Sequence, residues 1–208
     1  MFKSLTISLV LILVTTTSRI EGKANQQEER SRQQLHVRIY DYAQVSPETL
    51  AEAKSVASSI FRRIGVEISW LAQSVSSNSL EGNFNGEPVN PKLQLRILNR
   101  QMTKKLPVNK TMTGLAFHGT AGQAGRVANV FYHRVEDLAK SKTCSKGEIL
   151  GHAAAHELGH LLLGNLDHPS IGLMKAKLEH KDLQSAARGD LRFTEGEAEL
   201  IRRAISGQ

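Results

Sequence analysis

The segment from residue 145 to residue 164 constrains the fold more than any other part of the chain. Ser145 and Glu148 form a capping-box pattern, which begins a helix, and Gly164 is the residue type that ends one. Within this helix, residues 156–160 read His-Glu-Leu-Gly-His. Residues four apart lie on one helix face, about 6 Å apart along the axis, so two imidazoles can reach the same point. The rest of the chain must fold around this polar pair.

The spacing of His156 and His160 suits a metal ion. Zinc accepts imidazole nitrogens and prefers four ligands, so the two histidines need further ligands. Glu157 lies next to His156 and can reach a water on the metal without binding the metal itself. The pattern therefore predicts a zinc site in which Glu157 acts as general base. In a chain with eight histidines, it arises by chance in roughly one sequence in a hundred or fewer.

His152 extends the stripe of histidines by one more step of four. His152 and His160 are about 12 Å apart along a regular helix, which is too far for both to bind one ion. The pair of His152 and His156 is the rival pair, but Ala153 occupies the position where the glutamate would be needed. We expect His152 to support the site or the structure rather than to bind the metal.

The third ligand must come from outside the helix. Gly164 can adopt the left-handed conformation that turns the chain, and His168 follows four residues later. We favour His168, because the turn allows it to fold back to the metal. Carboxylates also bind zinc, so the alternatives are Asp167 and the downstream glutamates Glu179, Glu195 and Glu197. Tyr132, His133 and His152 are candidates for a further donor to the developing oxyanion, but we favour a packing role at a strand end for Tyr132 and a solvated position at a helix start for His133.

Alternating apolar residues predict strands elsewhere in the chain. The expected strands are residues 35–40, 66–71, 93–97, 114–117 and 126–132, and the expected helices are residues 47–64, 145–163 and 194–204. Residues 73–90, 99–110 and 118–125 are expected to form loops or turns. The order predicts an α+β fold: a mixed sheet packed by a long N-terminal helix and the zinc-site helix, with C-terminal helices. The first strand-helix-strand unit should be parallel.

Residues 151–174 resemble the zinc helix of zincin metallopeptidases, and the third histidine followed by a methionine is similar to the metzincin branch. The resemblance implies a zincin-like fold, ligands His156, His160 and His168, base Glu157 and turn residues Gly164 and Met174. The third histidine follows the second by six residues in that family and by eight here, and Leu163 and Leu166 hold the family's glycine and histidine positions. The resemblance also implies that a peptide substrate binds beside an edge strand, either residues 114–117 or residues 126–132.

The N-terminus predicts export. Lys3 precedes an apolar run over residues 4–14 and small polar residues over 15–18, as in a signal peptide, which we place at residues 1–22. The apolar run is too short for a membrane span, which needs about 20 residues. Residues 23–34 are polar and are expected to be a flexible lead-in to a single domain over residues 35–208. We therefore expect a secreted or periplasmic protein with no membrane span after cleavage.

Composition narrows the range of partners. The chain carries a formal net charge of +7, but its basic residues are scattered, so nucleic-acid binding is not expected. Cys144 is the only cysteine, which excludes an internal disulfide, and no surrounding pattern marks it as a nucleophile. The sequence predicts a monomeric zinc metalloendopeptidase that acts on a peptide or protein. The alternative is a non-catalytic zinc-binding domain outside the cytoplasm.

Overall fold

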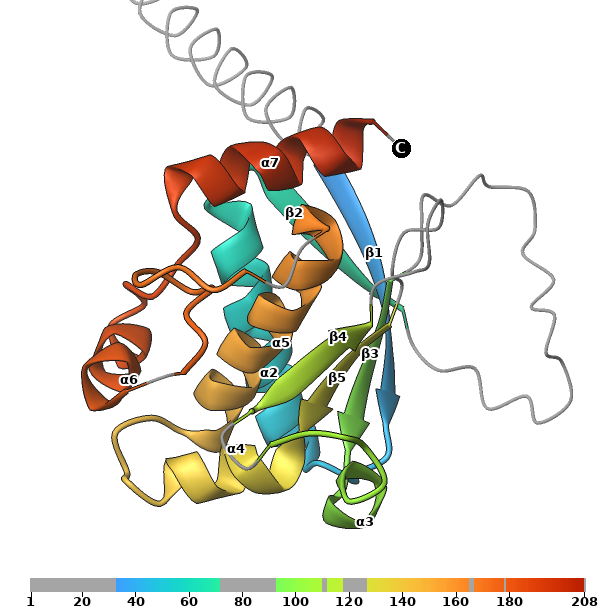
Figure 1. Cartoon of the computed structure of the whole chain (residues 1–208), viewed down its shortest axis with the longest axis vertical. Helices are drawn as coiled ribbons and strands as arrows, with labels where there is room; N and C mark the ends of the chain where they lie inside the picture. Colours follow the sequence, from blue (N-terminus) through green and yellow to red (C-terminus); the bar gives the residue numbers. More distant parts are fainter. Residues whose placement is uncertain are drawn as a thin grey trace, which may run out of the picture. The chain divides into compact units, whose positions relative to one another are not determined.

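Two long helices, α2 (Pro47–Arg62) and α5 (Lys146–Leu163), pack against each other over one face of a five-stranded sheet in this computed structural model (Figure 1). The structure describes residues 33–71, 93–109, 112–117, 127–164, 167–177 and 179–207. These residues belong to one compact unit, Gln33–Gln208. None of the helices in these ranges is long and apolar enough to cross a bilayer.

The sheet is mostly parallel. Its strands are β1 (Gln33–Asp41), β2 (Val66–Leu71), β3 (Leu93–Leu98), β4 (Gly114–Phe117) and β5 (Val127–Phe131), in the spatial order β2-β1-β3-β5-β4. The pairs β1–β2, β1–β3 and β3–β5 are parallel, whereas β4 runs antiparallel to β5 at the edge. The expectation of a mixed α and β architecture with a parallel first unit is confirmed.

The alternation in the strand sequences sets the orientation of the sheet. In β1, the side chains of Leu35, Val37 and Ile39 are buried, whereas those of His36 and Arg38 between them are only partly buried. Successive side chains on a strand point to opposite faces, so the apolar set faces α2 and α5 and joins their buried side chains in one core. α5 packs mainly against β4 and β5, at one end of the sheet.

The helix ends follow the signals in the sequence. The side chain of Ser46 accepts a hydrogen bond from Thr49 N at the start of α2, with Pro47 in the first turn. At the start of α5, Ser145 and Glu148 form both hydrogen bonds of a capping box. Gly164 ends α5 with φ 70° and ψ 15°, the left-handed conformation that glycine adopts without strain.

Several elements differ from the sequence-based expectations. β1 begins at Gln33, two residues earlier than expected, because Gln33 and Gln34 pair with Val66 and Glu67. β5 ends at Phe131, since the chain turns directly into a helix. The structure also contains α3 (Arg100–Thr103), α4 (Tyr132–Ala139) and α6 (His180–Ala187), whose ranges were not predicted, besides α7 (Glu195–Ser206).

Some expectations lie outside the described residues. They are the signal peptide over residues 1–22, most of the lead-in over residues 23–34, the loop over residues 73–90 and the glycine-rich turn over residues 118–125.

Gly151 allows α2 and α5 to approach closely. A Cβ atom built at this position would lie 2.7 Å from the Ala53 carbonyl oxygen and 2.7 Å from Val56 Cβ. Because the nearest atom belongs to the backbone of α2, a side chain here can be accommodated only if the helices move apart. Gly151 therefore sets the close crossing of α2 and α5.

We expect Gly151→Ala to lower the free energy of unfolding by about 1–3 kcal/mol, the usual effect of overpacking. Gly196→Ala is the matched control, since no atom lies within 4 Å of a Cβ at Gly196 in α7. Alanine favours helix over glycine, so this control should be neutral or slightly stabilising. Denaturant unfolding of the purified proteins measures both effects. Equal stability of parent and Gly151→Ala would contradict the tight crossing.

Candidate metal centre

Three histidines converge at the C-terminal half of α5. His160 Nε2 lies 2.9 Å from His156 Nε2 and 3.1 Å from His168 Nε2. The three candidate ligand atoms all lie within 4.8 Å of one another, and they are the one such group among the described residues. Nitrogens bound to one tetrahedral zinc are about 3.3 Å apart, given bonds of about 2.0–2.1 Å. The spacing of the three rings therefore fits a shared metal ion.

The tautomer of His156 favours metal binding. His156 Nδ1 lies 2.8 Å from the Leu173 carbonyl oxygen and must donate to it, because a carbonyl oxygen can only accept. This leaves the lone pair on Nε2, the atom that faces His160. Burial lowers the pKa of His156 to about 4, so the imidazole is neutral near pH 7 and able to bind a metal.

The turn that carries Leu173 is held from both sides. Leu173 N donates to the Arg192 carbonyl at 2.8 Å, and Gly172 takes φ 79°, a conformation suited to glycine. Met174, in the same turn, is fully buried. A Cβ at Gly159 would lie 2.8 Å from Met174 Sδ. Met174 therefore packs against α5 at Gly159, which lies between His156 and His160 in the sequence. The glycine of the His-Glu-Leu-Gly-His segment makes room for this turn.

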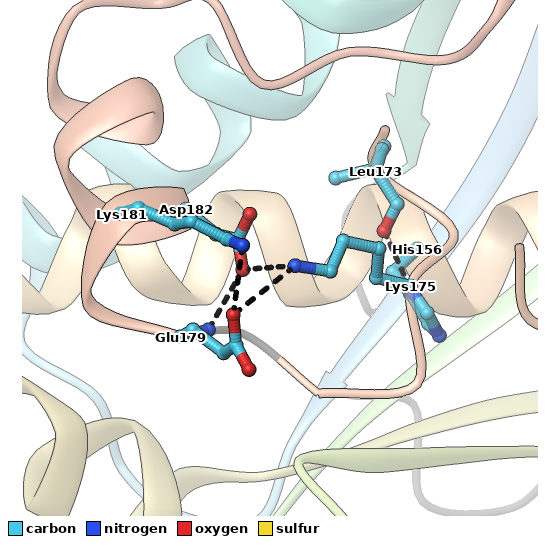
Figure 2. A network of polar contacts seen from close by, with 6 residues as sticks. All are labelled: His156, Leu173, Lys175, Glu179, Lys181 and Asp182. Carbon is cyan, nitrogen blue, oxygen red and sulfur yellow. Dashed lines mark hydrogen bonds and ion pairs between the residues drawn. The ribbon is translucent and has the colours of Figure 1, made fainter. Parts of the chain in front are cut away.

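Ion pairs extend this support to α6. Figure 2 shows the Lys175 amine pointing at the carboxylates of both Asp182 and Glu179, with the Leu173–His156 hydrogen bond nearby. Lys175 Nζ lies 2.6 Å from Asp182 Oδ2 and 3.8 Å from Glu179 Oε2, and Glu179 N donates to Asp182 Oδ2 at 2.8 Å. These contacts fix the segment that follows the turn and therefore help to orient His156.

Glu157 is buried beside the histidines. Its carboxylate hydrogen-bonds to the Ala116 main chain of β4, which lowers its pKa, but burial has the larger effect and raises the pKa to about 8. A Cβ at Gly114 would collide with Glu157 Oε1, so β4 approaches the carboxylate through a glycine. A carboxyl group with this pKa can take up and release a proton near neutral pH.

The site opens into a cleft of about 370 Å³. Residues from three parts of the chain line it: Asn109, Met112 and Thr113 with Gly114–Ala116 of β4; His152, Ala153, His156, Glu157 and His160 of α5; and His168, Leu173 and Lys175–Lys177. The cleft therefore lies between the edge strand, the helix and the segment that follows it. Glu157 and the three converging histidines therefore share one cleft.

The structure separates the candidates named from the sequence. His168 joins His156 and His160, whereas the carboxylate alternatives lie elsewhere in the described structure. Glu179 pairs with Lys175 and Lys181, Glu195 pairs with Arg202, and Glu197 caps α7 at Thr194. Asp167 is exposed and is not part of the cluster.

The structure also separates the other residues considered from the sequence by their position relative to the cleft. Tyr132 and His133 are in the first turn of α4 and do not line the cleft, whereas His152 does. Cys144 is buried and its thiol donates to the Leu183 carbonyl, in keeping with the expectation that it is not a nucleophile. Lys175 and Ala116 contact the site but were not singled out from the sequence, because only the fold brings them to α5.

Comparison with protein-family models and with curated proteins returned no match. The interpretation of the site therefore depends on its residues and geometry.

The three-histidine site predicts how metal binding responds to substitution. His168→Ala should lower zinc affinity by at least tenfold, since it removes one of three protein ligands. His152→Leu should leave zinc affinity within about threefold of the parent, because His152 lies outside the cluster. Competition with a chelating dye measures both affinities. Unchanged affinity in His168→Ala would mean that His168 is not a ligand.

Metal-free protein should lose stability between pH 6.5 and pH 8 because of Glu157. Its pKa rises from 4.5 in the unfolded chain to about 8 when folded, so in this range only the folded state holds the proton. Rising pH then favours unfolding. The pKa of His156 is lowered from 6.5 to about 4, so this residue makes stability rise with pH, but only below pH 6.5.

From pH 6.5 to pH 8, the free energy of unfolding of the metal-free parent should fall by about 2 kcal/mol more than that of Glu157→Gln. Urea unfolding at both pH values, with a chelator present, measures the difference. Parallel pH dependence in the two proteins would contradict a protonated buried Glu157.

Proposed function

We propose that this protein is a zinc-dependent peptidase. The observation that carries the proposal is the convergence of three imidazole nitrogens beside the buried carboxyl group of Glu157 in one cleft. Three histidines suit zinc better than calcium or magnesium, which prefer oxygen ligands. Three protein ligands also leave a position open for water or substrate, as in catalytic rather than structural zinc sites. Bound zinc would polarise a peptide carbonyl and lower the pKa of a coordinated water.

Glu157 supplies the proton transfers that peptide hydrolysis requires. As the base, its carboxylate accepts the proton of the attacking water. As the acid, it then delivers that proton to the leaving amine. Its hydrogen bond to the Ala116 main chain holds the carboxylate at the edge-strand side of the cleft. A metal cation nearby would lower the pKa of Glu157 and keep the carboxylate ionised before the reaction.

The edge strand favours a peptide as the substrate. β4 lines the cleft and pairs with β5 on one side, whereas β5 lies between β3 and β4 within the sheet. An extended peptide can add to an exposed strand edge through main-chain hydrogen bonds. Of the two segments considered from the sequence, residues 114–117 are therefore the candidate substrate strand, since residues 127–131 are already paired on both sides.

The arrangement supports the proposed resemblance to zincins of the metzincin type. A mixed sheet with an antiparallel edge strand lies against the helix that carries His156, Glu157 and His160. His168 follows the Gly164 turn, and Met174 lies buried against Gly159. The longer spacing between His160 and His168 does not prevent the third imidazole from reaching the cluster. The apolar N-terminus adds a proposed location, secreted or periplasmic.

Replacement of the proposed base tests the function. Glu157→Gln should retain about one zinc per chain and lose at least a hundredfold in the rate of peptide-library cleavage, the usual scale of general-base catalysis. A chelator should abolish cleavage by the parent, and added zinc should restore it. Mass spectrometry of the digested library measures the rate and identifies the cleaved bonds.

Glu136→Gln is the matched control, because Glu136 is a half-exposed glutamate on α4 outside the cleft. It should cleave at the parental rate. If Glu157→Gln cleaves as fast as the parent, Glu157 is not the base. If the zinc-loaded parent cleaves nothing, the non-catalytic zinc-binding alternative replaces the peptidase.

A further inference from the structure

His152 carries a buried hydrogen-bonding atom that has no partner in the described part of the chain, and the residue lines the cleft. The residue is only 3% exposed, and its Nε2 atom has no hydrogen-bond partner among the described residues. Proteins rarely leave a buried polar atom unpaired, and those that remain need a specific explanation such as an absent ligand or water. The same residue lines the cleft together with His156 and Glu157. Nε2 itself is shielded from solvent in this structure, so a molecule bound in the cleft can pair with it only where the cleft wall shifts slightly around the ring.

The other ring nitrogen determines what Nε2 can do. His152 Nδ1 lies 2.8 Å from the Glu148 carbonyl oxygen, one turn earlier in α5, so Nδ1 carries the hydrogen and donates it. Burial lowers the pKa of His152, which keeps the imidazole neutral near pH 7. Nε2 then holds a lone pair and can only accept. This arrangement argues against the role considered from the sequence, in which His152 donates to an oxyanion.

A bound peptide carries the complementary group. An extended peptide beside β4 directs its main-chain N–H groups alternately toward the strand and away from it. Those that face away find no partner on the strand, and a buried N–H without a partner is strongly disfavoured. Every residue except proline has a main-chain N–H. An acceptor fixed on α5 therefore suits the main chain of a substrate of any sequence that lacks proline at the facing position.

We propose that His152 Nε2 accepts a hydrogen bond from one main-chain N–H of the bound peptide, and that the enzyme therefore rejects proline at that substrate position. This inference rests on the proposed peptidase function and adds a substrate-binding residue to it. His152 makes contact with the substrate but takes no part in the proton transfers, which belong to Glu157.

An ester scan tests the contact. Starting from the best-cleaved library peptide, each non-scissile N–H is replaced in turn by an ester oxygen, which removes one donor with little change of shape. Replacement of an N–H that pairs with β4 should lower kcat/KM equally in the parent and in His152→Leu. One further replacement should lower kcat/KM of the parent about tenfold or more, because it leaves Nε2 unpaired. Proline at the same position should abolish cleavage. In His152→Leu, that ester should change kcat/KM by less than about twofold relative to the amide peptide.

Controls separate a contact from a structural effect. His180→Leu, at an exposed position on α6, should retain parental kcat/KM and the parental ester sensitivity. If every ester that lowers kcat/KM does so equally in parent and His152→Leu, or if proline is accepted at every position, the inference is wrong while the peptidase function stands. If the parent cleaves no peptide, both fail.

A second measurement does not depend on the folding of His152→Leu. In ¹⁵N-histidine-labelled, zinc-loaded Glu157→Gln, the His152 signals, assigned with His152→Gln, should show hydrogen on Nδ1 and none on Nε2. Adding the uncleaved amide peptide should shift the Nε2 signal, and adding its ester analogue should not. A hydrogen on Nε2, or no shift with the amide peptide, would overturn the inference.

Discussion

The hydrogen bond from His156 Nδ1 to the Leu173 carbonyl joins the two parts of the chain that make the site. It sets the tautomer of His156 and directs its lone pair toward His160 and His168. It also holds the turn at Gly172–Met174 against α5, while Leu173 N is held by the Arg192 carbonyl. A metal-binding histidine commonly donates its second nitrogen to a carbonyl or carboxylate, which fixes the ring and raises its basicity. The packing of Met174 against Gly159 and the ion pairs of Lys175 reinforce the same connection.

Burial of Glu157 is the second constraint, and it opposes stability. A carboxyl group enclosed between α5 and β4 is held at a pKa of about 8, so its ionised form is disfavoured until a cation is nearby. Gly114 makes this burial possible, because a side chain there would collide with the carboxylate as β4 passes it. Buried groups that lower the stability of the folded state, as Glu157 does, are typical of functional sites. The same reasoning applies to the unpaired Nε2 of His152.

The sequence predicted the parts of the structure whose signals are local. The capping box and the left-handed glycine defined α5, and the alternation of Leu35, Val37 and Ile39 defined the buried face of β1. Helical spacing alone placed His156, Glu157 and His160 correctly relative to one another. It also excluded His152 as a partner of His160 in one metal site, and the structure leaves His152 outside the cluster.

The features that the sequence did not predict depend on weak local signals or on contacts between residues far apart in the chain. α4 begins at the end of β5 without a side-chain cap, and the capping box of α6 uses Glu179 and Asp182 in place of the usual serine or threonine. The choice between His168 and the carboxylates required the path of the chain after Gly164. The pairing of Glu157 with Ala116 joins residues far apart in sequence. The acceptor role of His152 depends on its tautomer, which a sequence does not specify.

The most direct test of the account is the coordination of zinc in the loaded protein. X-ray absorption at the zinc edge reports the number of imidazole ligands and the lengths of their bonds. The account requires three imidazoles, with bonds of about 2.0–2.1 Å to nitrogen, and one light non-imidazole ligand in the remaining position. Loss of one imidazole signal in His168→Ala would identify that ring. A sulfur ligand from Cys144, or a parent spectrum with only two imidazoles, would contradict the three-histidine centre on which the proposed function rests.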